Sequence, residues 1–116
     1  LKARKMLEML ENYKILKLFQ KHPQLEPLFE DILKKCDSKL IILFGSYAKD
    51  IPKRESDIDI YIETEEQSMK EKIEEINSKL SVSIGRFNKS SLLIKEIIKN
   101  HVILKGAERF YEQLFN

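Results

Sequence analysis

An alternating segment at residues 56–63, Ser-Asp-Ile-Asp-Ile-Tyr-Ile-Glu, constrains the fold of this chain more than any other stretch. Successive side chains of a β-strand point to opposite faces of a sheet. The pattern therefore predicts a strand whose three isoleucines lie on one face, with Asp57 and Asp59 side by side on the other. Two carboxylates held this closely repel each other unless a cation lies between them.

A second predicted strand comes just before this segment in the chain. Residues 40–44, Leu-Ile-Ile-Leu-Phe, form a continuous apolar run, which is typical of a strand covered on both faces. Gly45 and Ser46 end the run, and a polar, basic stretch that contains Lys53 and Arg54 leads to the aspartates. We expect the glycine–serine turn to face the two carboxylates.

The rest of the sequence predicts helices that alternate with short strands. Pro27 suits the first position of a helix, and Ser90 is the expected N-cap of another. Strands that alternate with helices predict an α/β (or α+β) domain, in which helices flank a small mixed β-sheet. The further expected elements are two N-terminal helices before residue 39, a charged helix over 65–80, a strand over 80–87, a helix over 90–100, a strand over 101–105 and a helix over 107–115.

The first of these helices carries a broad apolar stripe. Its members recur at helical spacing before Pro23, and they are Met6, Met9, Leu10, Tyr13 and Leu16. We interpret the stripe as core or as an interface. So broad a face on a terminal helix could seal a homodimer or dock a domain that this sequence lacks.

Composition limits the classes of protein to which this chain can belong. Its 116 residues support one domain, and 42% hydrophobic with 34% charged residues is a globular composition. A net charge of +2 is too small to indicate a nucleic-acid partner by itself. The single cysteine, Cys36, excludes an internal disulfide and favours a reducing, cytoplasmic setting. No apolar run approaches the ~20 residues that a membrane span needs.

The aspartate pair and the glycine–serine turn together suit a metal ion and a phosphate. Mg²⁺ prefers one or two carboxylates together with water and substrate phosphates, so the aspartate pair is a candidate Mg²⁺ site. Backbone N–H groups that open a short helix after Gly45, with the hydroxyl of Ser46, could bind phosphate oxygens. Lys49, Lys53 and Arg54 lie between the turn and the aspartates, and they could neutralise a triphosphate or could be ordinary loop charges. These parts suit phosphoryl or nucleotidyl transfer.

Residues 45–59, Gly-Ser-Tyr-Ala-Lys-Asp-Ile-Pro-Lys-Arg-Glu-Ser-Asp-Ile-Asp, resemble the signature of the DNA polymerase beta-type nucleotidyltransferase superfamily. That signature is a Gly-Ser after the first strand and an Asp-X-Asp on the next. Ten residues separate Ser46 from Asp57, as in the minimal nucleotidyltransferases, or MNT group, and the chain is similar to archaeal members. The resemblance implies a nucleotidyltransferase fold over residues 39–116. Residues 1–38 would be a helical extension and could be the remnant of a longer N-terminal region.

The resemblance also implies roles for the matching residues. Gly45 and Ser46 would hold the nucleotide phosphates, with Lys53 and Arg54 beside them, and the aspartate pair would bind one or two Mg²⁺ ions. The implied reaction moves a nucleoside monophosphate, with AMP from ATP as the first choice, to an acceptor hydroxyl. In small proteins of this group the acceptor is often another protein, usually a HEPN-domain toxin that the MNT protein neutralises by adding AMP to a tyrosine.

One feature departs from the family pattern. Active members usually carry a third carboxylate on a neighbouring strand, where this sequence offers Ser81 and Ser83. Two alternatives to an active enzyme therefore stay open. The domain could bind nucleotide or a partner without catalysis. It could also be a regulator whose DNA contacts lie in the N-terminal helices or in a helix-turn-helix ahead of residue 1.

Overall fold

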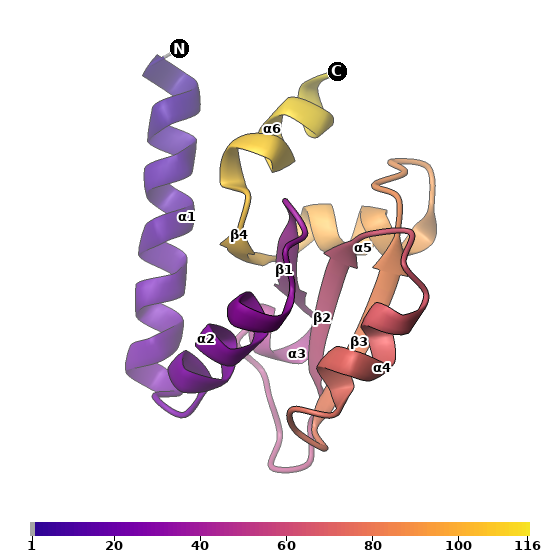
Figure 1. Cartoon of the computed structure of the whole chain (residues 1–116). Helices are drawn as coiled ribbons and strands as arrows, with labels where there is room; N and C mark the ends of the chain where they lie inside the picture. The colour runs from indigo at the N-terminus through magenta and orange to yellow at the C-terminus, as the bar shows by residue number, and fades with distance from the viewer. Residues whose placement is uncertain (1) are drawn as a thin grey trace.

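Four strands form one sheet at the centre of the protein, with helices on both sides (Figure 1). The computed structural model describes residues 2–116. The strands are β1 (Ile41–Phe44), β2 (Ile58–Glu63), β3 (Leu80–Gly85) and β4 (Val102–Lys105). The helices are α1 (Lys2–Lys21), α2 (Leu25–Lys35), α3 (Gly45–Ala48), α4 (Ser68–Glu74), α5 (Leu92–Lys99) and α6 (Ala107–Phe115).

The sheet is mixed, with the strand order β3-β2-β1-β4. β1 pairs antiparallel with both β2 and β4, whereas β2 and β3 run parallel. A parallel pair needs a crossover connection, and α4 lies in the segment that joins β2 to β3. The predicted α/β class, a small mixed sheet flanked by helices, is confirmed.

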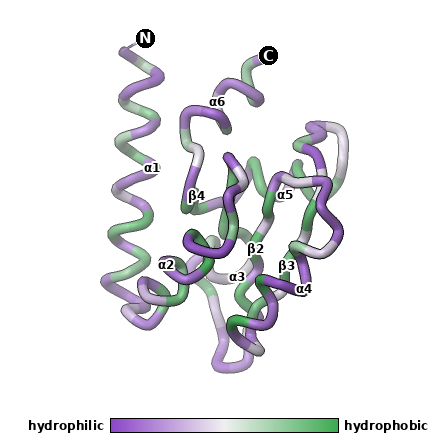
Figure 2. The backbone as a smooth tube through the Cα atoms, in the orientation of Figure 1, coloured by the Kyte–Doolittle hydropathy of each residue, from purple (hydrophilic) through white to green (hydrophobic). Residues whose placement is uncertain are grey.

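The two faces of the sheet carry separate hydrophobic cores. Ile58, Ile60 and Ile62 of β2 lie in the core that α2 and α4 cover, as the alternating pattern predicts. On the opposite face, Tyr61 lies in the core that α5 and α6 cover. Residues of β1 enter both cores, and each of its four residues is buried. In Figure 2 hydrophobic colour accordingly concentrates in the strands.

The apolar stripe predicted on α1 points away from both cores. Its five members are between 56% and 69% exposed, and they are Met6, Met9, Leu10, Tyr13 and Leu16. The side of α1 that packs on the protein instead uses Leu7, Ile15, Leu18 and Phe19. α1 therefore carries apolar side chains on more than one side, and Figure 2 shows them interspersed with hydrophilic positions along the helix.

A buried carboxylate fastens α1 to the rest of the protein. Glu11 is 4% exposed, accepts a hydrogen bond from the hydroxyl of Tyr111 and lies 3.2 Å from Nε2 of His101. Nδ1 of His101 is 2.9 Å from the carbonyl oxygen of Ile97. Burial raises the pKa of Glu11, but hydrogen bonds from His101, Lys14 and Tyr111 outweigh it and hold the pKa at about 2. His101 is thus a structural residue that holds Glu11 and the end of α5 together.

Two helix boundaries differ from those predicted. α2 begins at Leu25, so that Pro27 lies in its first turn, where a missing N–H costs no intrahelical bond. α4 ends at Glu74, well before the predicted end of that helix at Leu80, whereas Leu80 opens β3 as the predicted strand over 80–87 does.

The predicted N-cap of α5 is one residue too early. The hydroxyl of Ser91, and not that of Ser90, accepts the N–H of Ile94 at 3.1 Å. Ser90 instead donates to the side-chain oxygen of Asn88 at 2.6 Å. Ser90 and Ser91 offer the same capping chemistry, so the backbone position of each serine relative to the first turn decides which hydroxyl caps the helix. Among the described helices, none is both long and apolar enough to cross a bilayer.

Candidate active site

Gly45 forms the sharp bend between β1 and the short helix α3. Its φ angle is +73°, a left-handed conformation that side chains disfavour. A Cβ atom at this position would lie 2.1 Å from Oδ2 of Asp59. Both the turn and the close approach of the carboxylate therefore require glycine. The predicted convergence of the glycine–serine turn with the aspartates is confirmed at Asp59.

The two aspartates enter the site from the start of β2. Asp59 is half-buried and pairs in register with Phe44, the last residue of β1. Asp57 is exposed and lies just before the strand, which begins at Ile58. The sequence placed both aspartates on the strand, whereas the ladder includes only the second. Asp57 consequently keeps more freedom to adjust to a bound group.

Three charged side chains from different parts of the fold act on Asp59, two of them acidic and one basic. Burial raises the pKa of Asp59, and the negative charges of Asp57 and Glu96 raise it further, while Lys49 lowers it. Nζ of Lys49, at the end of α3, lies 3.5 Å from Oε1 of Glu96 on α5. The corner therefore has an excess of negative charge that a cation would relieve.

Sequence reasoning missed Glu96 as a neighbour of this corner. Lys49 was expected among the basic residues between the glycine–serine turn and the aspartates, and its charge does act on Asp59. Glu96 is 37 positions beyond Asp59, and only the packing of α5 on the polar face of the sheet brings it close. Glu96 is one of three charged residues on α5, with Lys95 and Lys99, so nothing in the sequence singled it out.

Lys53 and Arg54, the two predicted phosphate contacts, lie in the exposed loop between α3 and β2. The backbone of Lys53 is fixed, because its N–H donates to the hydroxyl of Ser56 at 2.7 Å. Neither side chain is among the charges that act on Asp59. Their role in phosphate binding stays a prediction, and Lys49 is the cation that the fold brings to the corner.

Ser81 occupies the position beside Asp59 on the neighbouring strand. In the parallel ladder, Asp59 pairs with Ser81 and Tyr61 pairs with Ser83, so these side chains share one face of the sheet. β3 is therefore a neighbour of β2, as the sequence analysis expected of this strand, and it presents serines beside Asp59 and Tyr61. Within residues 2–116, no three carboxylate, histidine or cysteine side chains gather into a metal-binding cluster.

Tyr61 shares the polar face of β2 but is closed off from solvent. It is 1% exposed, and its hydroxyl donates to the carbonyl oxygen of Gly85 at 2.7 Å. Its ring packs edge-on against Phe87, with 6.4 Å between the ring centroids. Tyr61 is thus a core residue and offers no free ring face to a base.

The donor set at this corner fits Mg²⁺. Asp57 and Asp59 offer hard carboxylate oxygens, and Mg²⁺ is typically bound by one or two carboxylates together with substrate phosphates and water. The space that a Cβ of residue 45 would fill is taken by the Asp59 carboxylate, so the carboxylate reaches the bend itself. The N–H groups in the first turn of α3 have no intrahelical acceptor, and this turn begins at Gly45, whose Cβ position abuts the Asp59 carboxylate.

The similarity of this chain to known proteins lies at the level of a protein family. No curated protein sequence matches the chain. One solved structure, "Crystal structure of the toxin-antitoxin with AMP-PNP", is 22% identical, covers 90% of this chain and 88% of that chain, and superposes with a TM-score of 0.47. The family model described as "Polymerase beta, Nucleotidyltransferase" matches residues 13–109, which include β1, the glycine–serine bend and both aspartates. This chain belongs to the polymerase beta-type nucleotidyltransferase family.

Proposed function

We propose that this protein is a Mg²⁺-dependent nucleotidyltransferase that moves AMP from ATP to a hydroxyl group of a protein acceptor. The observation that carries the proposal is the contact between the Gly45 bend and the Asp59 carboxylate, because it joins a phosphate-binding turn to a metal-binding acid. In this proposal residues 39–116 form the catalytic domain and residues 1–38 form an extension. A cytoplasmic location is part of it, since Cys36 is free and buried.

Each residue of the corner has a separate task in the proposed reaction. The N–H groups after Gly45 and the hydroxyl of Ser46 bind phosphate oxygens of ATP. Asp57 and Asp59 hold Mg²⁺, which supplies charge neutralisation at the phosphates when it is bound. Lys49 adds positive charge at the edge of the corner, where its present partner is Glu96. These groups position the triphosphate and offset its charge, which is most of what such a transfer requires.

The proposed acceptor is a HEPN-domain toxin, which the protein would silence by adding AMP to a tyrosine. This part follows from the resemblance of residues 45–59 to the MNT group. An acceptor protein supplies its own hydroxyl, so the corner needs no bound sugar or nucleic-acid end.

A catalytically degenerate nucleotide- or partner-binding domain is a second candidate function. The observation that favours it is Ser81 in the ladder position beside Asp59. A serine at neutral pH is not a general base, and it binds Mg²⁺ more weakly than a carboxylate does. A degenerate domain would bind ATP without transferring any part of it.

Labelled ATP separates these functions. The full chain is incubated with Mg²⁺ and the protein encoded beside its gene, once with ATP labelled at the α-phosphate and once with ATP labelled at the γ-phosphate. Nucleotidyl transfer labels the acceptor from α-labelled ATP alone. Label from the γ-phosphate would indicate phosphoryl transfer and contradict the proposal. Thermal stabilisation by ATP without any label would support the degenerate domain.

Two variants connect the label to the aspartates. Asp57→Asn removes a charge from an exposed side chain, so the fold is retained while labelling is lost. Asp31→Asn, on the exposed side of α2, is the matched control and keeps full labelling. Chelation of Mg²⁺ with EDTA abolishes labelling in the wild type. Equal labelling by wild type and Asp57→Asn would remove Asp57 from the site.

A further inference from the structure

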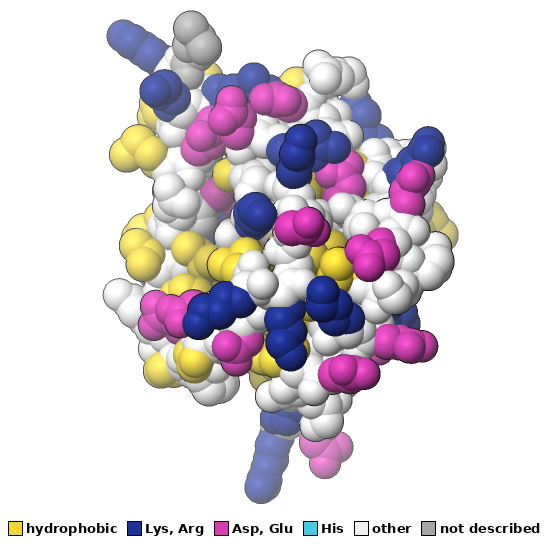
Figure 3. All heavy atoms as spheres, in the orientation of Figure 1, with side chains coloured by type: hydrophobic (Ala, Val, Ile, Leu, Met, Phe, Trp, Pro, Cys, Tyr) yellow, Lys and Arg dark blue, Asp and Glu magenta, His cyan; other side chains and the backbone are white. Residues whose placement is uncertain are grey.

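The outer face of α1 combines two kinds of side chain, apolar and basic, that no element within residues 2–116 covers. Towards the N-terminus it exposes Met6, Met9, Leu10 and Tyr13, each more than half exposed. Figure 3 shows hydrophobic side chains along the edge of the molecule where α1 lies. Several large apolar side chains together on one helix indicate a surface that another molecule covers.

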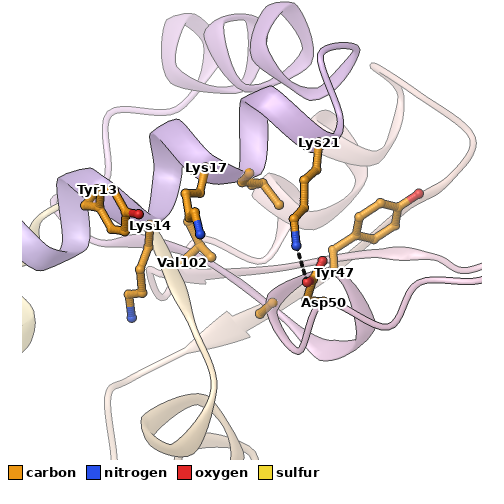
Figure 4. Close-up of a pocket in the computed structure, with 9 residues that line it drawn as sticks. Tyr13, Lys14, Lys17, Lys21, Tyr47, Asp50 and Val102 are labelled. Carbon is orange, nitrogen blue, oxygen red and sulfur yellow. Dashed lines mark hydrogen bonds and ion pairs between the residues drawn. The ribbon is translucent and has the colours of Figure 1, made fainter.

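Towards its C-terminus the same helix lines a cavity of about 230 Å³ against α3 (Figure 4). Three lysines line it from the α1 side, at positions 14, 17 and 21, and spacings of three and four place them on one side of the helix. The single carboxylate in the lining is Asp50, which pairs with Lys21. The lining therefore has an excess of positive charge over a floor that includes Leu18 and Val102.

The ion pairs around this cavity leave positive charge available to bind an anionic group. Lys21 and Asp50 are both more than half exposed, so their pairing is weak and is easily exchanged. Lys14 pairs with Glu11 at 2.8 Å. Nζ of Lys17 lies 5.5 Å from the ring centroid of Tyr13, and no ion pair of Lys17 occurs among residues 2–116. Lys17 is thus the cation most available to a ligand.

The apolar face and the cavity meet at Tyr13, and the cavity extends to α3, the short helix that begins at the Gly45 bend. Tyr13 belongs to both parts. Tyr47 and Ala48 line the cavity from α3, whose first residue, Gly45, contacts Asp59. At a rise of 1.5 Å per residue, the cavity and the bend are about 5 Å apart along that helix. A molecule on this surface would reach from the outer end of α1 to α3, the helix that follows the Gly45 bend.

We propose that this surface docks a segment of a partner protein whose apolar side chains cover the N-terminal half of α1 and whose carboxylates enter the lysine-lined cavity. That the partner is also the acceptor rests on the proposed nucleotidyl transfer. The apolar half favours a protein over a nucleic acid, because phosphates would leave the exposed methionines and Leu10 unburied. A second copy of this chain is a poor occupant, because its α1 brings the same lysines and its two acids are partly buried Glu8 and buried Glu11.

Synthetic helical peptides test the proposal without ATP or Mg²⁺, so the result does not depend on catalysis. The probes are fluorescent peptides of about 18 residues, or five helical turns, with a leucine stripe followed by three glutamates. In two matched peptides the glutamates become glutamines or lysines. A single-stranded oligonucleotide is the nucleic-acid probe, and anisotropy is measured at about 50 mM and 200 mM salt.

We expect the full chain to bind the glutamate peptide at least about fivefold more tightly than the lysine peptide, and less tightly as salt rises. Lys17→Glu should weaken that binding about fivefold, whereas Lys34→Glu on exposed α2 should leave it unchanged. The double variant Met9→Ser with Leu10→Ser changes two exposed positions. It should weaken the binding of all three peptides about tenfold or more.

Three results would overturn the docking proposal. They are equal binding of the three peptides or none, tighter binding of the oligonucleotide than of the glutamate peptide, and a dimer in sedimentation that Met9→Ser with Leu10→Ser disperses. A dimer of that kind would assign the surface to a second copy. ATP-induced thermal stabilisation is measured on the same samples. If ATP still stabilises the protein but no peptide binds, the docking proposal fails and the proposed nucleotide site stands. If peptides bind but ATP does not stabilise the protein, the nucleotide site fails and the docking proposal stands.

Discussion

The α-carbon of Gly45 lies so close to Asp59 that a Cβ at residue 45 would be 2.1 Å from the carboxylate oxygen Oδ2. Gly45→Ala must therefore move Asp59 as well as strain a backbone whose φ is +73°. We expect a loss of at least about 1–2 kcal/mol in unfolding free energy and the disappearance of thermal stabilisation by ATP with Mg²⁺. Differential scanning fluorimetry with and without nucleotide measures both.

Gly85→Ala is the control for backbone strain alone. Gly85 also has a positive φ, +147°, but nothing lies within 4 Å of the position that a Cβ would occupy there. This variant should lose stability and still respond to ATP with Mg²⁺. An undiminished nucleotide response in Gly45→Ala would contradict the role of the bend.

The pairing of Glu11 with His101, Tyr111 and Lys14 predicts a specific acid sensitivity. Folding lowers the pKa of the Glu11 carboxyl from 4.5 to about 2. Its charge therefore stabilises the folded protein fully at pH values above 4.5, and this contribution is lost as the pH falls towards 2. Glu11→Gln should therefore cost roughly 2–3 kcal/mol at neutral pH, and the difference from wild type should shrink as pH falls from about 4.5 to about 2. Urea unfolding across this pH range measures the difference.

Glu26→Gln gives the matched comparison, because Glu26 is exposed on α2. Its unfolding free energy should follow that of the wild type at every pH. A difference between wild type and Glu11→Gln that stays constant with pH would show that the loss comes from packing and not from the charge of Glu11.

The sequence predicts the local parts of this structure well because their causes are local. The period-two pattern of β2 fixes which side chains share a face, and it correctly places Asp59 opposite the isoleucines. Glycine followed by serine after a buried strand predicts the bend at Gly45 for the same kind of reason. The charge partners of Asp59 are a different matter, because the contribution of Glu96 depends on how α5 packs across the sheet.

The outward stripe of α1 shows the limit of periodicity. Spacing identifies which side chains share a side of a helix, but α1 has a second apolar set that includes Leu18 and Ile15. Only the packing partners decide which set is buried. The buried Glu11 was unpredictable for a related reason, because its partners His101 and Tyr111 are about 90–100 residues away in the chain.

The buried hydroxyl of Tyr61 predicts a structural rather than a ligand-binding role. Tyr61→Phe removes the hydrogen bond to the carbonyl oxygen of Gly85 and should cost about 1 kcal/mol in unfolding free energy. Because the ring is enclosed, the dissociation constant for ATP should not change. Tyr13→Phe, on the exposed face of α1, should change neither quantity. A tenfold weaker affinity of Tyr61→Phe for ATP would place the tyrosine in the nucleotide site.

The register of β3 on β2 makes Ser81 the position at which a third carboxylate can be restored. Ser81→Asp would put an acid directly beside Asp59 in the parallel ladder. Since that corner already carries the charges of Asp57 and Glu96, the metal-free variant should lose about 1 kcal/mol by like-charge repulsion. Mg²⁺ should remove this loss, so the variant should bind the ion several-fold more tightly and label its acceptor faster than the wild type. Isothermal titration with Mg²⁺ in the presence of a non-hydrolysable ATP analogue measures the first effect.

Ser83→Asp, whose ladder partner is the buried Tyr61, adds the same charge two positions further along the strand and should give neither gain. If both variants behave alike, the corner defined by Asp57 and Asp59 is not where the metal binds.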